Sequence, residues 1–209
     1  GITQAIGTTE IPLETIKQIC GPILEKFRFD VTIPGLLFID TPGHEAFTTL
    51  RKRGGSIADF AIVVVDIVEG IMPQTKESIE ILRETKTPFA IAVNKIDRIS
   101  GWTTYKDSFL ENVKEQRKDV LESFESAFYT IVNQFYNQGF SVDRFDRIQD
   151  FTETVAAIPV SGKTGEGISE LLAIVIGLSQ QFLKNRLVKT EKGEGMIMEV
   201  RDFVGLAPP

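Results

Sequence analysis

The stretch from Phe89 to Asp97 reads Phe-Ala-Ile-Ala-Val-Asn-Lys-Ile-Asp, and it sets the fold class of the chain. Its first five residues form a short apolar run, which is typical of a strand buried on both faces of a parallel sheet. Three further runs share this character and cover residues 35–39, 60–65 and 155–160. Because helices bury both faces of a parallel sheet, we expect helices between these runs.

Helical periodicity is present in the intervals between the apolar runs. Apolar residues recur every three or four positions over about 12–27, over a segment that begins at Pro73, and over about 168–182. Strands that alternate with helices predict an α/β fold, with a doubly wound and mostly parallel sheet. In such sheets the ligand binds at the carboxyl ends of the strands.

Residues 100–150 interrupt this alternation with a helical insertion. Apolar residues repeat there at helical spacing and charged residues cover the other face, so we expect one or two long helices that end near Gly139. From about residue 188 the composition predicts a linker, and a strand-like run follows at 196–200. We therefore expect one domain over 1–188, and a linker with the first strand of a second domain over 189–209.

The composition predicts a soluble cytoplasmic protein with a packed core. Apolar residues make up 42% of the 209, and the formal net charge is −6, so any RNA contacts need other parts or a partner. Cys20 is the single cysteine, which excludes an internal disulfide. No apolar run reaches the roughly 18 residues that span a bilayer, and we expect no signal peptide before the domain. Because the first residue is Gly1, we expect the sequence to start mid-chain.

The first chemical motif is Asp40-Thr41-Pro42-Gly43-His44, directly after the run 35–39. An aspartate at the end of a buried strand can hold a hydrated Mg²⁺ beside phosphates. The backbone N–H of Gly43 can donate to a terminal phosphate, because glycine allows close approach. The alternative interpretation is an ordinary turn after a strand.

The second motif is Asn94-Lys95-Ile96-Asp97, and it ends the deciding stretch. A carboxylate can accept two parallel hydrogen bonds, and guanine offers N1–H and its exocyclic amino group in that geometry. Asp97 is therefore the candidate guanine selector. Asn94 can donate to N7, and the aliphatic stem of Lys95 can cover the purine face.

The third motif, Ser161-Gly162-Lys163, follows the run 155–160 and can offer backbone N–H groups to the guanine O6. Alone it is a solvated turn. The three motifs together, each at the end of a strand and on the same edge of one sheet, predict a guanine-nucleotide site. Gly162-Lys163-Thr164 also looks like the end of a phosphate-binding loop, but that pattern needs glycine at position 157, which is Ala157.

These motifs resemble those of initiation-type translational GTPases of the P-loop GTPase fold, and the resemblance covers nearly the whole chain. Gly1-Ile2-Thr3-Gln4 is similar to their switch I, and residues 40–48 are similar to their switch II. The segment 12–27 and the insertion at 100–150 resemble the archaeal and eukaryotic translation initiation factor 5B family, and the archaeal form above all. Bacterial initiation factor two shares the switch motifs only. The family's phosphate loop and first strand are not among these 209 residues, and Gly162 stands where the family usually has alanine.

The resemblance implies roles for single residues. Thr3 and Asp40 would bind Mg²⁺, Gly43 would sense the γ-phosphate, and His44 would position the attacking water. Guanine would be read by a set of six residues: Asn94, Lys95, Asp97, Ser161, Gly162 and Lys163.

The implied activity is GTP hydrolysis that promotes ribosomal subunit joining with initiator tRNA in place. GTP or GDP and Mg²⁺ would be the ligands. The large ribosomal subunit, the initiator tRNA complex and another initiation factor would be the partners of a monomeric chain that contacts no membrane. Two alternatives stay open: a ribosome- or factor-binding module that does not hydrolyse GTP, and a related tRNA-delivering GTPase. A phosphate loop upstream would exclude the first, and the downstream domains would decide the second.

Overall fold

The computed structural model describes residues 7–27, 31–40 and 58–183. Its centre is a four-stranded sheet with the order β3-β4-β6-β5, in which every neighbouring pair is parallel. The strands are β3 (Ala61–Asp66), β4 (Phe89–Asn94), β5 (Val142–Arg144) and β6 (Val155–Pro159). Three of these coincide with predicted apolar runs, and the predicted α/β class with a mostly parallel sheet is confirmed.

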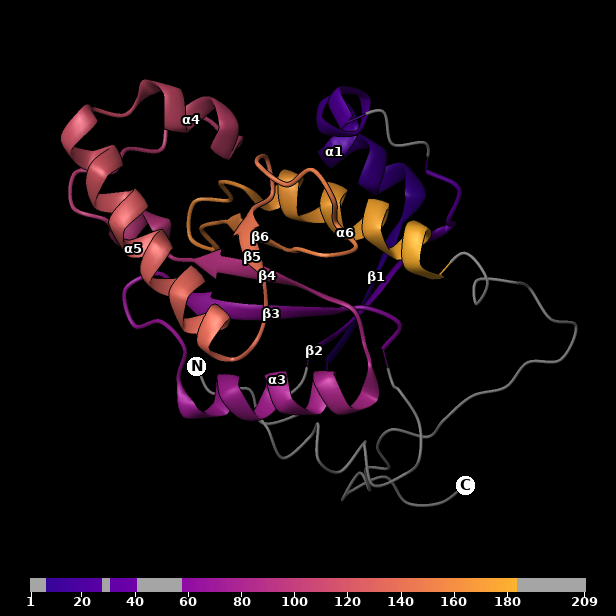
Figure 1. The fold of residues 1–209 in the computed structure, drawn as a ribbon. Helices are drawn as coiled ribbons and strands as arrows, with labels where there is room; N and C mark the ends of the chain where they lie inside the picture. The colour runs from indigo at the N-terminus through magenta and orange to yellow at the C-terminus, as the bar shows by residue number, and fades with distance from the viewer. Residues whose placement is uncertain (1–6, 28–30, 41–57, 184–209) are drawn as a thin grey trace, which may run out of the picture.

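Helices cover both faces of this sheet. Figure 1 shows α3 (Pro73–Thr85) on one side of the strands and α6 (Ile168–Leu183) on the other. Strand β4 runs between the two layers, and its first five residues are all buried. The residues that follow β4 and β6 therefore emerge together at the carboxyl edge of the sheet, toward the helical insertion (Figure 1).

A second, two-stranded sheet holds the predicted strand 35–39. Strand β2 (Gly35–Asp40) pairs antiparallel with β1 (Gly7–Pro12) through six register pairs, and α1 (Leu13–Phe27) connects them. The expectation that all three motifs lie on one edge of one sheet is therefore wrong for Asp40. Within the described ranges, the six ladder pairs of β2 are all with β1, while β3 pairs with β4, so the two sheets share no ladder.

Helix α1 fastens the two-stranded sheet to the rest of the fold. It packs on α6 in a small core of its own, made by Ile16, Cys20, Ile23, Leu24, Ile33, Leu172, Ala173 and Ile176. The Cys20 thiol is fully buried there. Burial, with the nearby Glu170 carboxylate adding to it, raises the pKa of Cys20 to about 11, so this thiol stays protonated and unreactive.

The insertion consists of two helices, α4 (Phe109–Glu115) and α5 (Lys118–Asn137). Helix α5 ends at Asn137, two residues before Gly139, whose φ of +82° is left-handed as is common just after a helix; the predicted end near Gly139 is confirmed. An aromatic core holds the insertion together: Trp102 stacks on Phe109 at 6.1 Å and contacts Phe124 at 5.2 Å between ring centroids.

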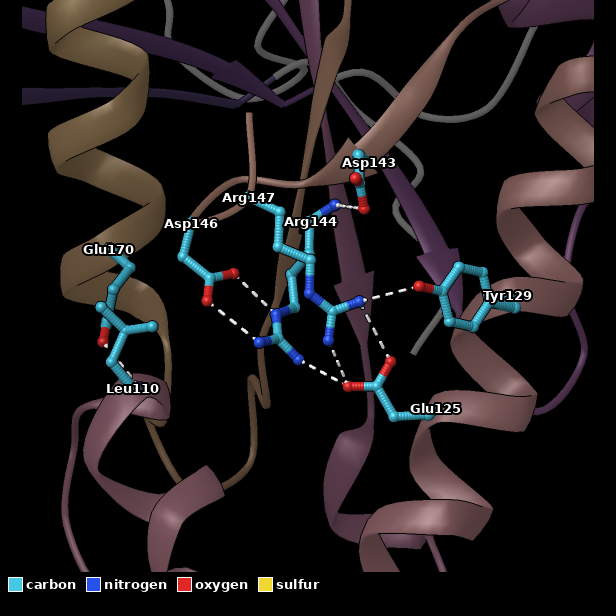
Figure 2. Close-up of polar contacts among 8 residues, drawn as sticks. All are labelled: Leu110, Glu125, Tyr129, Asp143, Arg144, Asp146, Arg147 and Glu170. Carbon is cyan, nitrogen blue, oxygen red and sulfur yellow. Dashed lines mark hydrogen bonds and ion pairs between the residues drawn. The ribbon is translucent and has the colours of Figure 1, made fainter. Parts of the chain in front are cut away.

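A cluster of arginines and carboxylates joins α5 to β5 (Figure 2). Arg144 binds Asp146 with two hydrogen bonds of 2.6 and 3.0 Å, and its third nitrogen donates to Glu125 on α5 at 2.8 Å. Arg147 also contacts Glu125 and donates to the Tyr129 hydroxyl at 3.1 Å. We call these five residues the arginine anchor.

Two predictions are left without a structural answer. The boundary near residue 188 and the strand at 196–200 lie outside the described residues. Among the residues that the structure does describe, no helix is both long enough and apolar enough to cross a membrane.

Candidate functional site

Asn94 ends β4 and ties two loops together. Its side-chain Oδ1 accepts hydrogen bonds from the backbone N–H of Lys95 at 2.7 Å and of Gly162 at 3.0 Å. The carbonyl oxygen of the amide is thus engaged in holding the backbone, which leaves the amide NH₂ as the group that can donate to a ligand. The predicted link between neighbouring loops is therefore present, while the donation to N7 stays a prediction.

Asp97 and Ser161 form the second link between the same loops. The Ser161 hydroxyl is fully buried and donates to Asp97 Oδ1 at 2.6 Å. Asp97 lies in a short 3-10 helix, Ile96–Arg98, directly after β4, and is half-buried. Each carboxylate oxygen has two lone pairs, so the bond from Ser161 orients the group and still leaves both oxygens able to accept from a ligand.

The loop 161–167 is closed by its own backbone. Ser161 N–H donates to the Glu166 carbonyl at 2.9 Å, and Gly165 N–H donates to the Ser161 carbonyl at 2.9 Å. Gly167 has a φ of +77°, and a Cβ there would lie 2.1 Å from the Pro159 carbonyl oxygen, so only glycine fits. At Gly162, by contrast, a Cβ would meet Asn94 at 3.7 Å, an ordinary contact, so the departure from the family's alanine leaves the loop geometry intact.

Lys95 adopts the left-handed conformation, with a φ of +66°. Its ammonium group contacts Asp66 Oδ2 at 2.7 Å, and Arg98 contacts the same oxygen at 3.1 Å. Burial by itself would raise the pKa of Asp66. Hydrogen bonds from Lys95 and from the backbone of Val68 and Glu69 outweigh burial and hold that pKa below its usual range.

Asp66 is a residue that the sequence interpretation missed. It is the last residue of β3 and the register partner of Asn94, so it lies at the same carboxyl edge. The signal was available, because an aspartate that ends a buried parallel strand faces the ligand edge.

Six of the predicted site residues are therefore brought together at one edge. Asn94, Lys95 and Asp97 follow β4, and Ser161, Gly162 and Lys163 follow β6, with Gly162 and Lys163 exposed to solvent. The edge offers a purine base one oriented carboxylate, one amide donor and the aliphatic stem of Lys95, whose ammonium group is paired with Asp66. The N–H groups of Ser161 and Gly162, which the sequence interpretation offered to the guanine O6, donate instead to Glu166 and Asn94.

The predicted phosphate and metal residues are placed only in part. Thr3, Gly43 and His44 lie outside the described residues. Asp40 is exposed at the end of β2, and the described ranges contain no cluster of three His, Cys, Asp or Glu side chains that could hold a metal ion. A single exposed carboxylate fits Mg²⁺ when the nucleotide's phosphates and water supply the other ligands.

Three comparisons with known proteins identify relatives of this chain. The family described as "Elongation factor Tu GTP binding domain" matches residues 1–181. The protein named "Probable translation initiation factor IF-2" of Methanopyrus kandleri is 54% identical over 209 residues, which are 99% of this chain and 35% of that protein. The protein of the same name from Sulfolobus acidocaldarius is also 54% identical, over 98% of this chain and 34% of its own length.

A solved structure extends the similarity to three dimensions. The crystal structure of GDP-bound aIF5B from Aeropyrum pernix superposes with a TM-score of 0.84 at 51% identity, over 92% of this chain and 32% of that one. The chain thus spans about a third of the length of these relatives.

Proposed function

The chain belongs to the elongation factor Tu GTP-binding-domain family, together with the archaeal proteins named initiation factor IF-2 and aIF5B, and on this premise we propose that it binds and hydrolyses GTP in translation initiation. In this proposal the hydrolysis is stimulated by the ribosome and promotes subunit joining with initiator tRNA in place. Subunit joining, tRNA contact and the role of the single catalytic residue are proposed for the full-length protein.

The observation that carries the proposal is the double link between the loops after β4 and β6. Asn94 binds Gly162 N–H at 3.0 Å and Ser161 binds Asp97 at 2.6 Å. These bonds hold an oriented carboxylate at the ligand edge of the sheet. Guanine offers that carboxylate two adjacent N–H donors, whereas adenine offers neither, so the site favours guanine.

The remaining predicted residues would bind the phosphates, the Mg²⁺ ion and the attacking water. Asp40 would hold a hydrated Mg²⁺ through its water, and Thr3 would add a hydroxyl ligand. Mg²⁺ would neutralise the charge that develops on the phosphate oxygens. Gly43 would donate its backbone N–H to the γ-phosphate, and His44 would orient the attacking water.

GTP hydrolysis by the full-length protein, with and without ribosomes, tests this function. We expect ribosomes to stimulate hydrolysis, and we expect His44→Ala to lower the stimulated rate at least about a hundredfold while GTP binding stays near normal. Unchanged turnover in that variant would remove His44 from the mechanism. GTP binding with no ribosome-stimulated hydrolysis in the unaltered protein would support a binding module instead.

A further inference from the structure

Two glutamates are fully buried where the insertion meets α6. Glu166 and Glu170 expose none of their surface. Among the described residues, neither forms an ion pair with a lysine or arginine, and their side-chain bonds come from neutral donors. A buried carboxylate is costly unless its hydrogen bonds are satisfied, so its position calls for a reason.

Glu166 links the insertion to the loop 161–167. Its side-chain Oε2 accepts from the Trp102 indole N–H at 3.1 Å and from the Thr104 hydroxyl at 2.6 Å. Its backbone carbonyl accepts Ser161 N–H at 2.9 Å, the bond that closes the loop. Glu166 therefore closes the loop 161–167 through its backbone and binds the segment that leads into α4 through its side chain.

The other carboxylate oxygen, Glu166 Oε1, is buried and has no hydrogen-bond partner in the described part of the chain. Burial raises the pKa of Glu166, and the neighbouring Glu170 carboxylate adds to the rise, although the hydrogen bonds from Thr104 and Trp102 oppose it. The fold therefore accepts the cost of burying the Glu166 carboxylate at a residue that belongs to the loop 161–167.

The segment that Glu166 binds, which contains Trp102 and Thr104, follows directly from the 3-10 helix that contains Asp97. The backbone N–H of Ile99 donates to Ile96 at 3.1 Å, and that of Trp102 donates to Ile99 at 3.0 Å, so one hydrogen-bonded run leads from the Asp97 helix to Trp102. The two segments thus meet twice. Ser161 contacts Asp97 at one end, and Glu166 contacts Trp102 and Thr104 at the other.

We propose that Glu166 is a positioning residue for guanine recognition, which holds the loop 161–167 against the Asp97 segment through Trp102 and Thr104. The inference rests on the proposed function and adds to it that the helical insertion is coupled to base recognition. Because such coupling is reciprocal, bound guanine nucleotide stabilises the docked insertion, and a docked insertion raises the affinity for guanine nucleotide. Affinity differences within one protein lie mostly in the release rate, so we expect the docked insertion to slow nucleotide release.

A matched pair of variants in the full-length protein tests this proposal. Thr104→Val removes a 2.6 Å hydroxyl bond to Glu166, which precedes α6, and Ser108→Ala removes a 2.6 Å hydroxyl bond to Glu170, in the first turn of α6. The measurements are the release rate of a fluorescent GDP and the affinity ratio of GDP to IDP. IDP lacks the exocyclic amino group that Asp97 is expected to read.

We expect Thr104→Val to release GDP about tenfold faster, the loss typical of a hydrogen bond to a charged group, and to lower the GDP-to-IDP ratio. We expect Ser108→Ala to stay within about twofold of the unaltered protein, and Thr104→Ser to restore slow release. If Thr104→Val does not fold, Trp102→Phe removes the other donor to the same oxygen.

Three results are distinguishable. A folded Thr104→Val with unchanged release and ratio would overturn the proposal. Equal losses in Thr104→Val and Ser108→Ala would also overturn it, because general docking of the insertion would then be the cause. Failure of the unaltered protein to bind GDP would instead overturn the proposed function.

Discussion

The insertion is fastened to the α/β layer at two places that bury charge in opposite ways. The arginine anchor pairs carboxylates with guanidinium groups, as Figure 2 shows, whereas Glu166 and Glu170 are held by hydroxyl, indole and backbone donors. In the first, the charge of Arg144 lowers the pKa of Asp146 against the effect of burial. In the second, burial raises the pKa of Glu166.

This difference teaches how stability and function are divided. A charge-paired anchor is strong while both partners are present, and it is costly to break. Hydrogen bonds from neutral donors do not neutralise the charge of a buried carboxylate, so the Glu166 carboxylate remains unfavourable. Its position is nevertheless within the loop 161–167, which contributes to the base site. We expect the arginine anchor to set stability, and Glu166 to set the position of the loop.

Breaking the arginine anchor should give the largest effect. Arg144→Met removes a buried guanidinium and leaves Asp146 and Glu125 without their shared partner. We expect the free energy of unfolding to fall by about 3 kcal/mol, as measured by urea denaturation. GDP release from the folded variant should be unchanged.

The exposed pair of Lys118 and Glu122, at 3.8 Å, supplies the control for Arg144→Met. Lys118→Ala should change stability by less than about 0.5 kcal/mol, because exposed ion pairs contribute little. A similarly small effect of Arg144→Met would remove the distinction between the two anchors.

Asp146→Asn should weaken the same anchor by about 2 kcal/mol near neutral pH, since it removes a charged acceptor from a buried arginine. The folded-state pKa of Asp146 lies below its ordinary value of 3.8. Its contribution is therefore present above that ordinary value, and is lost as the pH falls through the lowered folded-state value. Urea denaturation of both proteins across the acid range measures the difference. A difference that does not shrink toward low pH would contradict the charge-paired interpretation.

Glu166→Gln should change the free energy of unfolding in the opposite direction and by a smaller amount. The amide keeps an acceptor for Trp102 and Thr104 and removes the cost of burying a charge without a cationic partner, so we expect the variant to be more stable by about 1 kcal/mol at neutral pH. The folded-state pKa of Glu166 lies above its ordinary value of 4.5. The unaltered protein should therefore lose stability relative to the variant as the pH rises from that value through the raised one. Equal stability of both proteins at all pH values would mean that the carboxylate is not strained.

The strands of the sheet and the base-reading motifs could be predicted because their signals are local. The apolar runs that became β3, β4 and β6, and the polar residues that follow them, need no knowledge of distant partners. Strand β1 gave no such signal, because it is mostly exposed and contains Thr8, Thr9 and Glu10. Strand β5 is three residues long and two of them are charged, so only its pairing with β6 makes it a strand.

Asp66 could have been predicted, because it ends a buried parallel strand beside Asn94. Long-range contacts decide the position of Glu166, which joins the site through Trp102, 64 residues away in the chain. Nothing local distinguishes a buried glutamate from an exposed one, and glutamate is usually exposed. The placement of Asp40 in a separate sheet was missed for the same kind of reason, because strand partners are set by the whole chain.

The measurement that tests the central claim most directly is competition of GDP, XDP and ADP for the full-length protein and for its Asp97→Asn variant. The unaltered protein should prefer GDP. In the variant, an amide donor replaces one carboxylate acceptor and suits the xanthine carbonyl, so the preference should move to XDP. A variant that still binds GDP as tightly as before, with no gain for XDP, would show that Asp97 does not read the base.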